Sequence, residues 1–203
     1  MKVCEEILDG ELKEQFPLAV YQTGSGTHSN MNVNEVIAGR GNEIAGEKLL
    51  HPNGHVNMSQ SSNDTFPTAM HIAALTAVED RLIPALRKLA DIFKKLENEN
   101  SSVMKTGRTH LQDATPMTFG QEISGWRSCL EHDITMIEQA PQTLRELAIG
   151  GTAVGTGINA PEGFGEKAAD EISRITGKQH NAGKGESYSM RGCYNGVRSG
   201  YGQ

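Results

Sequence analysis

The sequence lacks the patterns that mark several large classes of protein. Its three cysteines show neither CxxC nor any other zinc-ligand spacing, so we expect reduced thiols and no disulfide framework. No apolar run approaches the length that crosses a bilayer. The first residues contain no signal-peptide core and are too acidic for a transit peptide. These absences favour a cytoplasmic protein that contacts no membrane, with the mitochondrial matrix as the alternative location.

Positive charge and hydrophobic residues are also scarce. The formal net charge is -6, and no basic cluster is long enough to follow a phosphate backbone, so a nucleic-acid partner is not expected. Hydrophobic residues make up 36% of the 203 residues, which is low for a self-contained globule. The length corresponds to one domain or to a large piece of one.

Helical periodicity dominates what the sequence does contain. Apolar residues recur at helical spacing from Asp64 to Leu96 and form a wide set, which predicts a helix buried on more than one side. Pro84 lies inside this stretch and is expected to bend it. The other expected helices span residues 34–45, residues 118–147 with a bend at Pro141, and residues 159–177 with Asn159 as the cap. We find no convincing strand, so the predicted fold class is mainly α.

The predicted helices make only part of a long-helix bundle. We expect residues 1–62 to be the remnant of an N-terminal domain with binding loops, and residues 63–177 to be part of a central helical bundle. Residues 178–203 are rich in glycine and serine and poor in aliphatic residues, which predicts a disordered tail. The wide apolar faces of an incomplete bundle need partner helices, which points to a homo-oligomer or to missing sequence.

Three polar segments carry the chemistry of this sequence, at residues 23–32, 59–64 and 107–116. All three are dense in hydroxyls and carboxamides and poor in charge. Such groups can hold a small anion through neutral hydrogen bonds while His110 moves a proton. The segments therefore suggest acid–base chemistry on a small carboxylic acid without a metal, nucleotide or other cofactor. The glycines of residues 150–157 have no Walker lysine or Rossmann strand beside them, so we expect them to allow close backbone packing.

Over residues 16–177 the chain resembles class II fumarate hydratase, of the fumarase/aspartase superfamily. The motifs that carry the resemblance stand in the family order and occupy residues 22–27, 30–35, 51–53, 59–64, 107–116 and 150–157. Aspartases are similar through much of this region but carry glutamine at the position of His110, so an aspartate ammonia-lyase is the alternative. The resemblance implies the long-helix bundle of the L-aspartase-like fold in a homotetramer, with active sites built by loops from three subunits. It also implies reversible, stereospecific trans addition of water to fumarate, giving L-malate in the tricarboxylic acid cycle.

The resemblance assigns roles to residues of this chain. It implies that His110 and Thr109 are catalytic, that Ser25, Thr27, Ser61, Ser62 and Asn63 bind substrate, and that His51 and Asn53 belong to a secondary dicarboxylate site. At that secondary site Gly54 stands where the family usually has aspartate, and Lys48 stands where it usually has arginine.

The family's signature loop, which supplies the serine implicated as base and a substrate-binding lysine, is not in this sequence. A missing base removes a factor of about a hundred to ten thousand in rate, so we expect little or no hydratase activity from this chain alone. The alternative from another functional class is a non-catalytic fragment that associates with intact fumarase subunits.

Overall fold

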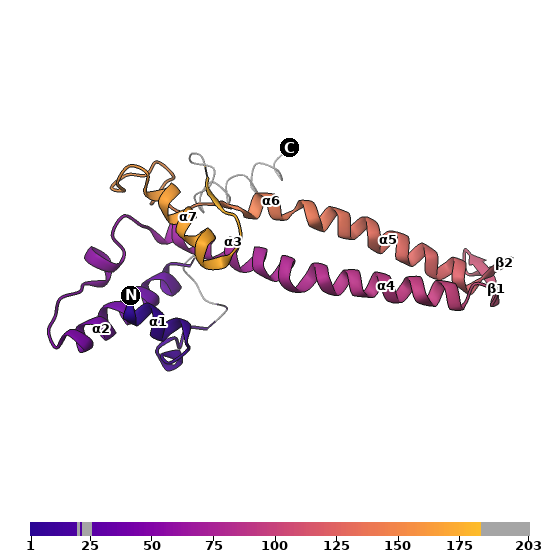
Figure 1. Cartoon of the computed structure of the whole chain (residues 1–203), viewed down its shortest axis with the longest axis horizontal. Coiled ribbons are helices and arrows are strands. Elements are labelled where there is room, and N and C mark those ends of the chain that lie inside the picture. The colour runs from indigo at the N-terminus through magenta and orange to yellow at the C-terminus, as the bar shows by residue number, and fades with distance from the viewer. Residues whose placement is uncertain (20, 22–25, 184–203) are drawn as a thin grey trace. The chain divides into compact units, whose positions relative to one another are not determined.

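The computed structural model describes residues 1–19, 21 and 26–183, which form two compact units (Figure 1). The first unit comprises residues 1–72 and the chain from residue 145 onward, and the second comprises residues 73–144. The boundaries of these units do not coincide with those of the predicted domains, residues 1–62 and 63–177. The predicted domains stay a prediction. The mainly helical fold class is confirmed.

The first unit contains short helices and one small sheet. Its elements are α1 (Lys2–Leu8), a 3-10 turn η1 (Lys13–Gln15), α2 (Thr27–Ala45), a π-helical turn η2 (Pro52–Val56), most of α3 (Ser62–Ala77), β3 (Glu146–Leu147), α7 (Phe164–Thr176) and β4 (Asn181–Ala182). The core of this unit lies where α7 packs against β3, around the buried side chains of Leu147, Ile149 and Ala169. Ile72 of α3 and Ala182 of β4 also pack against it.

The second unit is a pair of long helices joined by a β-hairpin. After the end of α3, its elements are a π-helical turn η3 (Val78–Leu82), α4 (Ile83–Glu99), β1 (Met104–Thr109), β2 (Gln112–Thr118), α5 (Phe119–Gln139) and α6 (Pro141–Leu144).

Two ion pairs between α4 and α5 show that these helices are antiparallel. Arg87 of α4 contacts Glu138 of α5 at 2.6 Å, and Arg127 of α5 contacts Glu97 of α4 at 2.7 Å. A residue early in α4 therefore meets a residue late in α5, as antiparallel helices require. Phe93 of α4 and Trp126 of α5 also face each other, with ring centroids 6.4 Å apart.

The helix predicted over residues 64–96 is present but interrupted. Pro84 has no backbone N–H, so it cannot donate the α-helical hydrogen bond to the carbonyl of the residue four positions earlier. The chain forms the π-helical turn η3 over Val78–Leu82, and α4 starts one residue before Pro84. The interruption is a change of helix type over five residues, and the bend expected at Pro84 stays a prediction.

Several predicted boundaries are wrong. Helix α2 begins at Thr27 and not at residue 34. Helix α5 ends at Gln139, and the stretch that follows α6 enters strand β3, so Leu147 is not helical. Helix α7 begins at Phe164 with Gly163 as its cap, so Asn159 does not cap a helix.

The expectation of no strands is also wrong. The hairpin of β1 and β2 is antiparallel, and β3 pairs with β4 in parallel. The predicted disordered tail is wrong for residues 181–182, which form β4 because the backbone of residues 145–147 accepts hydrogen bonds from Asn181 N and Gly183 N at 3.0 and 2.8 Å. The rest of that predicted tail, residues 184–203, lies outside the described residues.

Candidate active site

The loop of residues 59–64 is the entry to helix α3, and Ser61 caps this helix. The Ser61 hydroxyl accepts a hydrogen bond from Asn63 N at 3.2 Å, and Ser61 N donates to Asp64 Oδ1 at 2.9 Å. The Ser61 hydroxyl thus accepts from the second helical N–H as an N-cap does, and the Asp64 carboxylate supplies the returning bond of a capping box. They place Ser61 and Ser62 at the N-terminal end of a helix of 16 residues, where free N–H groups and the helix dipole favour an anion.

Asp64 ties this loop to a second loop, residues 150–159. Its side chain is fully buried, with 0% exposed, and Oδ2 accepts a hydrogen bond from Thr152 N at 2.8 Å. Asn63 adds a second link, because its Nδ2 donates to Ala153 O at 2.7 Å. Burial raises the pKa of the Asp64 carboxyl above its ordinary value, and hydrogen bonds from backbone amides, Ser61 and Thr152 among them, oppose that rise.

The raised pKa of Asp64 predicts the sign of a pH dependence. The folded chain holds this proton more tightly than the unfolded chain, so the Asp64 contribution to stability is full at low pH. It is lost as the pH rises from about 4, the ordinary aspartate value, through the raised pKa. Urea denaturation as a function of pH should therefore show wild type losing stability relative to Asp64→Asn across this window. A difference that stays constant or grows with pH would contradict this prediction.

A network of asparagines fixes the same loop to helix α2. Asn57 Oδ1 accepts hydrogen bonds from Asn30 Nδ2 at 3.1 Å and from Asn34 Nδ2 at 2.9 Å. Asn57 Nδ2 in turn donates to Gln60 O at 3.3 Å. Thr65 donates its hydroxyl proton to Asn30 Oδ1 at 2.8 Å. Uncharged side chains therefore hold the binding loop, and no fixed charge is placed beside it by this network.

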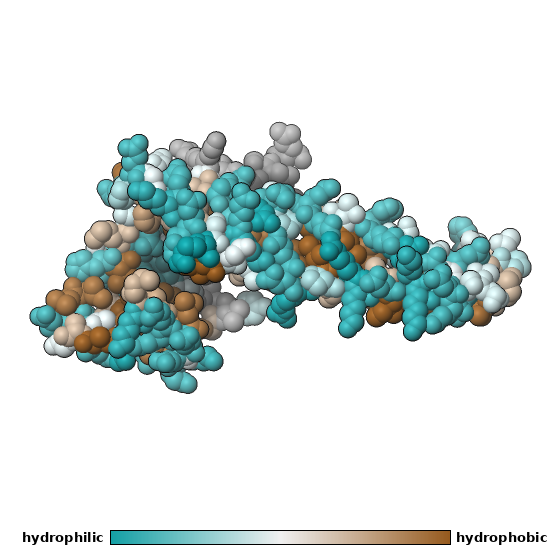
Figure 2. All heavy atoms as spheres, viewed as in Figure 1, coloured by the Kyte–Doolittle hydropathy of each residue, from teal (hydrophilic) through white to brown (hydrophobic). Residues whose placement is uncertain are grey.

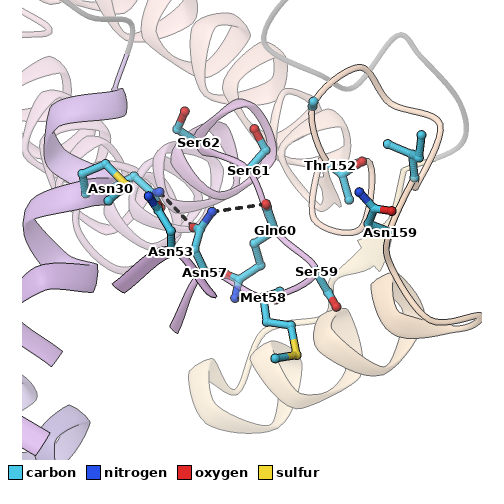
Figure 3. A pocket seen from close by; sticks show the side chains of 13 residues that line it. Asn30, Asn53, Asn57, Met58, Ser59, Gln60, Ser61, Ser62, Thr152 and Asn159 are labelled. Carbon is cyan, nitrogen blue, oxygen red and sulfur yellow. Dashed lines mark hydrogen bonds between the residues drawn. The ribbon is translucent and has the colours of Figure 1, made fainter. Parts of the chain in front are cut away.

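These loops line an open pocket of about 460 Å³, in which most of the lining residues are polar (Figure 3). Its lining comprises Asn30, Met31, Asn53, Asn57, Met58, Ser59, Gln60, Ser61, Ser62, Thr152, Ala153, Ile158 and Asn159. No Asp, Glu, Lys, Arg or His is among these lining residues. A small ligand in this pocket would meet hydroxyls, carboxamides and backbone groups.

The structure brings several predicted substrate-binding residues together. Ser61 and Ser62 line the pocket, and Thr27 Oγ1 lies 3.0 Å from Ser62 Oγ. Asn63 is adjacent but not in the lining, because its Nδ2 is directed to Ala153 O. Ser25 lies outside the described residues. The substrate-binding role of these residues stays a prediction.

The two residues of the predicted secondary site are joined by a turn. His51 caps η2, and its Nδ1 accepts hydrogen bonds from Asn53 N at 3.2 Å and from Gly54 N at 3.1 Å. A ring nitrogen that accepts two N–H groups is unprotonated, so Nε2 is the atom left to meet a ligand. Asn53 also lines the same pocket as Ser61, so the predicted secondary site and the predicted substrate site meet at this pocket.

Thr109 and His110 lie in the second unit, at the turn of the β-hairpin. Thr109 pairs with Gln112, which leaves His110 and Leu111 as a two-residue turn with φ values of 51° and 61°. Asparagine and glycine are the residues usual in such turns, because a β-carbon raises the energy of left-handed backbone. Both side chains are exposed. The first unit by itself therefore lacks the residue that the sequence predicts to move protons.

The left-handed conformation of Leu111 gives a direct test of strain in this turn. Its side chain is 98% exposed, so its removal loses almost no packing. Leu111→Gly should stabilise the hairpin by about 1 kcal/mol, whereas Leu111→Ala, which keeps the β-carbon, should change stability by only a few tenths. Urea denaturation followed by circular dichroism checks this. Equal stabilisation by both variants would exclude backbone strain as the cause.

The loop of residues 150–159 is the part of the pocket that sequence reasoning missed. The expected close packing of its glycines is confirmed, because a β-carbon on Gly150 would lie 2.6 Å from Gly165 Cα. The same loop also lines the pocket through Thr152 and Asn159, which both have left-handed backbone, with φ of 55° and 65°. Asn159 next to a glycine-rich loop was a sequence signal for left-handed turn backbone. The sequence pattern was instead interpreted as a helix cap at Asn159.

The described part of the chain contains neither a cluster of metal ligands nor a membrane-spanning helix. Over residues 1–19, 21 and 26–183, no three His, Cys, Asp or Glu side chains gather as a metal site would require. Over the same residues, no helix is both long enough and apolar enough to span a bilayer.

Comparison with known proteins identifies the family. A family model described as lyase matches residues 1–194. Class II fumarate hydratase from Bacillus anthracis is 58% identical over 180 residues, which are 87% of this chain and 39% of that protein. The protein of the same name from Listeria monocytogenes is 56% identical over 176 residues, with the same two shares covered. The crystal structure of class II fumarase from Schistosoma mansoni matches with a TM-score of 0.80 at 43% identity, covering 87% of this chain and 38% of that one. The chain therefore belongs to this lyase family, and it spans about two fifths of the length of the relatives that it matches.

Proposed function

We propose that this chain carries the carboxylate-binding part of a class II fumarate hydratase, which adds water to fumarate to give L-malate. The observation that carries the proposal is the pocket at the N-terminus of α3, whose lining combines hydroxyls and carboxamides with a few apolar side chains and contains no ionisable side chain. The relatives at 56–58% identity are named class II fumarate hydratases, which supports the same substrate. The proposal needs no metal or cofactor.

Neutral donors suit the intermediate of this reaction. Removal of the C3 proton of malate leaves an aci-carboxylate, which carries one more negative charge than the bound carboxylate. Ser61 and Ser62 already lie at a helix N-terminus, and the Thr27 hydroxyl is within hydrogen-bond distance of Ser62. Preorganised donors of this kind bind the additional charge more tightly than the ground state, which lowers the barrier.

Thr109 and His110 complete the proposal as the residues that position the departing hydroxyl of malate and give it a proton, so that it leaves as water. Histidine exchanges protons near neutral pH, and its place at an exposed hairpin turn leaves both ring nitrogens accessible to a partner surface. In the proposed assembly the hairpin of one subunit contributes to a site whose carboxylate donors come from another, as the resemblance implies.

The first experiment incubates the purified chain with L-malate and follows fumarate by its ultraviolet absorbance, with His110→Asn as the control. We expect binding of L-malate by calorimetry but little or no fumarate, because the serine loop is absent. Robust turnover that His110→Asn abolishes would overturn the expected inactivity and assign the base to a residue of this chain. Absence of L-malate binding would overturn the proposed function.

The aspartase alternative is separated by its products and ligands. His110 occupies the position at which aspartases carry glutamine, and it favours hydration over ammonia addition. We expect L-malate to bind and L-aspartate to bind much more weakly, and we expect no aspartate from fumarate with ammonium present. Tighter binding of L-aspartate would favour the aspartase.

Association through the long helices is the second candidate function. Large apolar side chains stand partly exposed on α4 and α5, including Leu89, Ile92, Leu96, Trp126 and Met136, and Figure 2 shows hydrophobic surface along this pair. Exposed apolar faces of this kind are buried by partner helices in bundles. We propose a homo-oligomer or a complex with intact subunits of the same family.

The single tryptophan provides the test of association. Trp126 is 50% exposed, so burial against another helix should shift its fluorescence to shorter wavelength as the protein concentration rises. Sedimentation should show the mass of an oligomer over the same range. A monomer with unchanged fluorescence, alone and with an intact class II fumarase, would exclude this proposal.

A further inference from the structure

We propose that Asn159 binds the ligand of the polar pocket through its side-chain carboxamide. The proposal deepens the proposed function and rests on it, because it assigns a further contact to the same carboxylate ligand. Asn159 lines the pocket together with Ser61 and Ser62. Figure 3 shows Thr152 and Asn159 on one side of the Ser59–Ser62 loop, with Asn30 and Asn53 on the other.

The carboxamide of Asn159 has no structural task in the described part of the chain. Sequence reasoning predicted it to cap the last helix, but α7 begins at Phe164 and Gly163 takes the capping position. Over the described residues, the Asn159 side chain forms no hydrogen bond, whereas Asn30, Asn57 and Asn63 all do. An amide with two donors and one acceptor is thus available to a ligand.

The backbone of Asn159 is left-handed at the edge of this pocket. Its φ is 65°, and Ser59 and Thr152, which also line the pocket, have φ of 65° and 55°. Left-handed backbone at residues other than glycine persists where surrounding structure enforces it, and it gathers at ligand sites. Three such residues around one pocket indicate that the loops are shaped for a ligand.

The loop that carries Asn159 is anchored to the loop that carries Ser61. Asp64 accepts hydrogen bonds from Ser61 N and from Thr152 N at 2.9 and 2.8 Å, and Asn63 holds Ala153 O at 2.7 Å. These bonds hold the start of the loop that carries Asn159 against the entry to α3. A ligand of the pocket that binds Ser61 and Ser62 can therefore also contact Asn159, which lines the same pocket.

The test is an NMR titration of ¹⁵N-labelled chain with L-malate. Asn159→Gly removes the carboxamide and suits the left-handed backbone, so the fold is kept, and Asn159→Asp replaces the donor by a negative charge. We expect malate to move the Asn159 side-chain amide resonances, Asn159→Gly to weaken binding about tenfold, and Asn159→Asp to abolish it. Asn98→Ala, an exposed asparagine on α4, is the matched control and should bind as wild type does.

Phosphate and citrate titrations separate this inference from the proposed function. Malate binding that is unchanged in both Asn159 variants would overturn the inference and leave the function standing. Binding of phosphate or citrate but not malate, with the same dependence on Asn159, would overturn the function and support the inference. A wild-type chain that binds none of the three anions would overturn both. Circular dichroism melting of each variant confirms that a lost affinity is not a lost fold.

Discussion

Replacing Asp64 with alanine should lower the free energy of unfolding by about 2–4 kcal/mol. The variant leaves the amide protons of Ser61 and Thr152 without their carboxylate acceptor in a region where Asp64 is fully buried. Each unsatisfied buried donor costs about 1–3 kcal/mol, and relief of the buried charge offsets part of the sum. Urea denaturation measures the total, and hydrogen exchange at Thr152 N measures the local effect.

The control for this variant is Asp170→Ala in the same unit. Asp170 is exposed on α7, so its removal should change stability by no more than about 0.5 kcal/mol. Asp64→Ala should also release the Thr152 amide to exchange, whereas Asp170→Ala should leave it protected. Equal denaturation midpoints for the two variants would show that Asp64 does not hold the two loops together.

Alanine at Gly165 should destabilise the first unit by about 1–3 kcal/mol, because overpacking against backbone cannot relax at little cost. A β-carbon at this position would lie 2.9 Å from Ile149 O and 3.5 Å from Gly150 Cα. Backbone atoms would have to move, and they belong to the segment that joins β3 to the pocket loop. Denaturation followed by circular dichroism should show a lower midpoint, and L-malate affinity should fall with it.

Gly39→Ala is the matched control, because it makes the same substitution in a helix of the same unit. Gly39 lies in α2, and a β-carbon there meets nothing within 4 Å. Helix propensity alone then favours alanine, so this variant should gain about 0.5–1 kcal/mol. The two variants should thus have opposite signs. A gain in stability at both positions would show that the approach of α7 to Ile149 is looser than the structure has it.

The helical content and the binding segments could be predicted from local sequence. Pro84 interrupts the first long helix because proline has no N–H to donate, wherever the helix lies. Hydroxyl and carboxamide residues stand just before Asp64, and such residues cap helices in any context. These features depend on neighbours along the chain, so the sequence alone was enough to expect a helix that starts near Asp64.

The strands and the missed side of the pocket could not be read in the same way. Strand β3 forms because β4, more than thirty residues later in the chain, supplies its hydrogen-bond partner. Leu147 ends a stretch with helical spacing, yet it is a fully buried strand residue. A window of ten or twenty residues around Leu147 does not contain its strand partner, because β4 pairs with β3 only after the chain has folded back.

The sequence by itself determined the family, the mainly helical class and the polar chemistry of the loops, because these follow from residue types at fixed spacing. Only the tertiary structure decided which of those loops meet. The buried carboxylate of Asp64 binds Thr152 N, 88 positions later in the chain, and the loop that follows Thr152 lines the same pocket as Ser61 and Ser62. Contacts of this kind depend on close packing between the backbones of Gly150 and Gly165. The glycine-rich motif suggests such packing, but the partner residue is decided only when the chain folds.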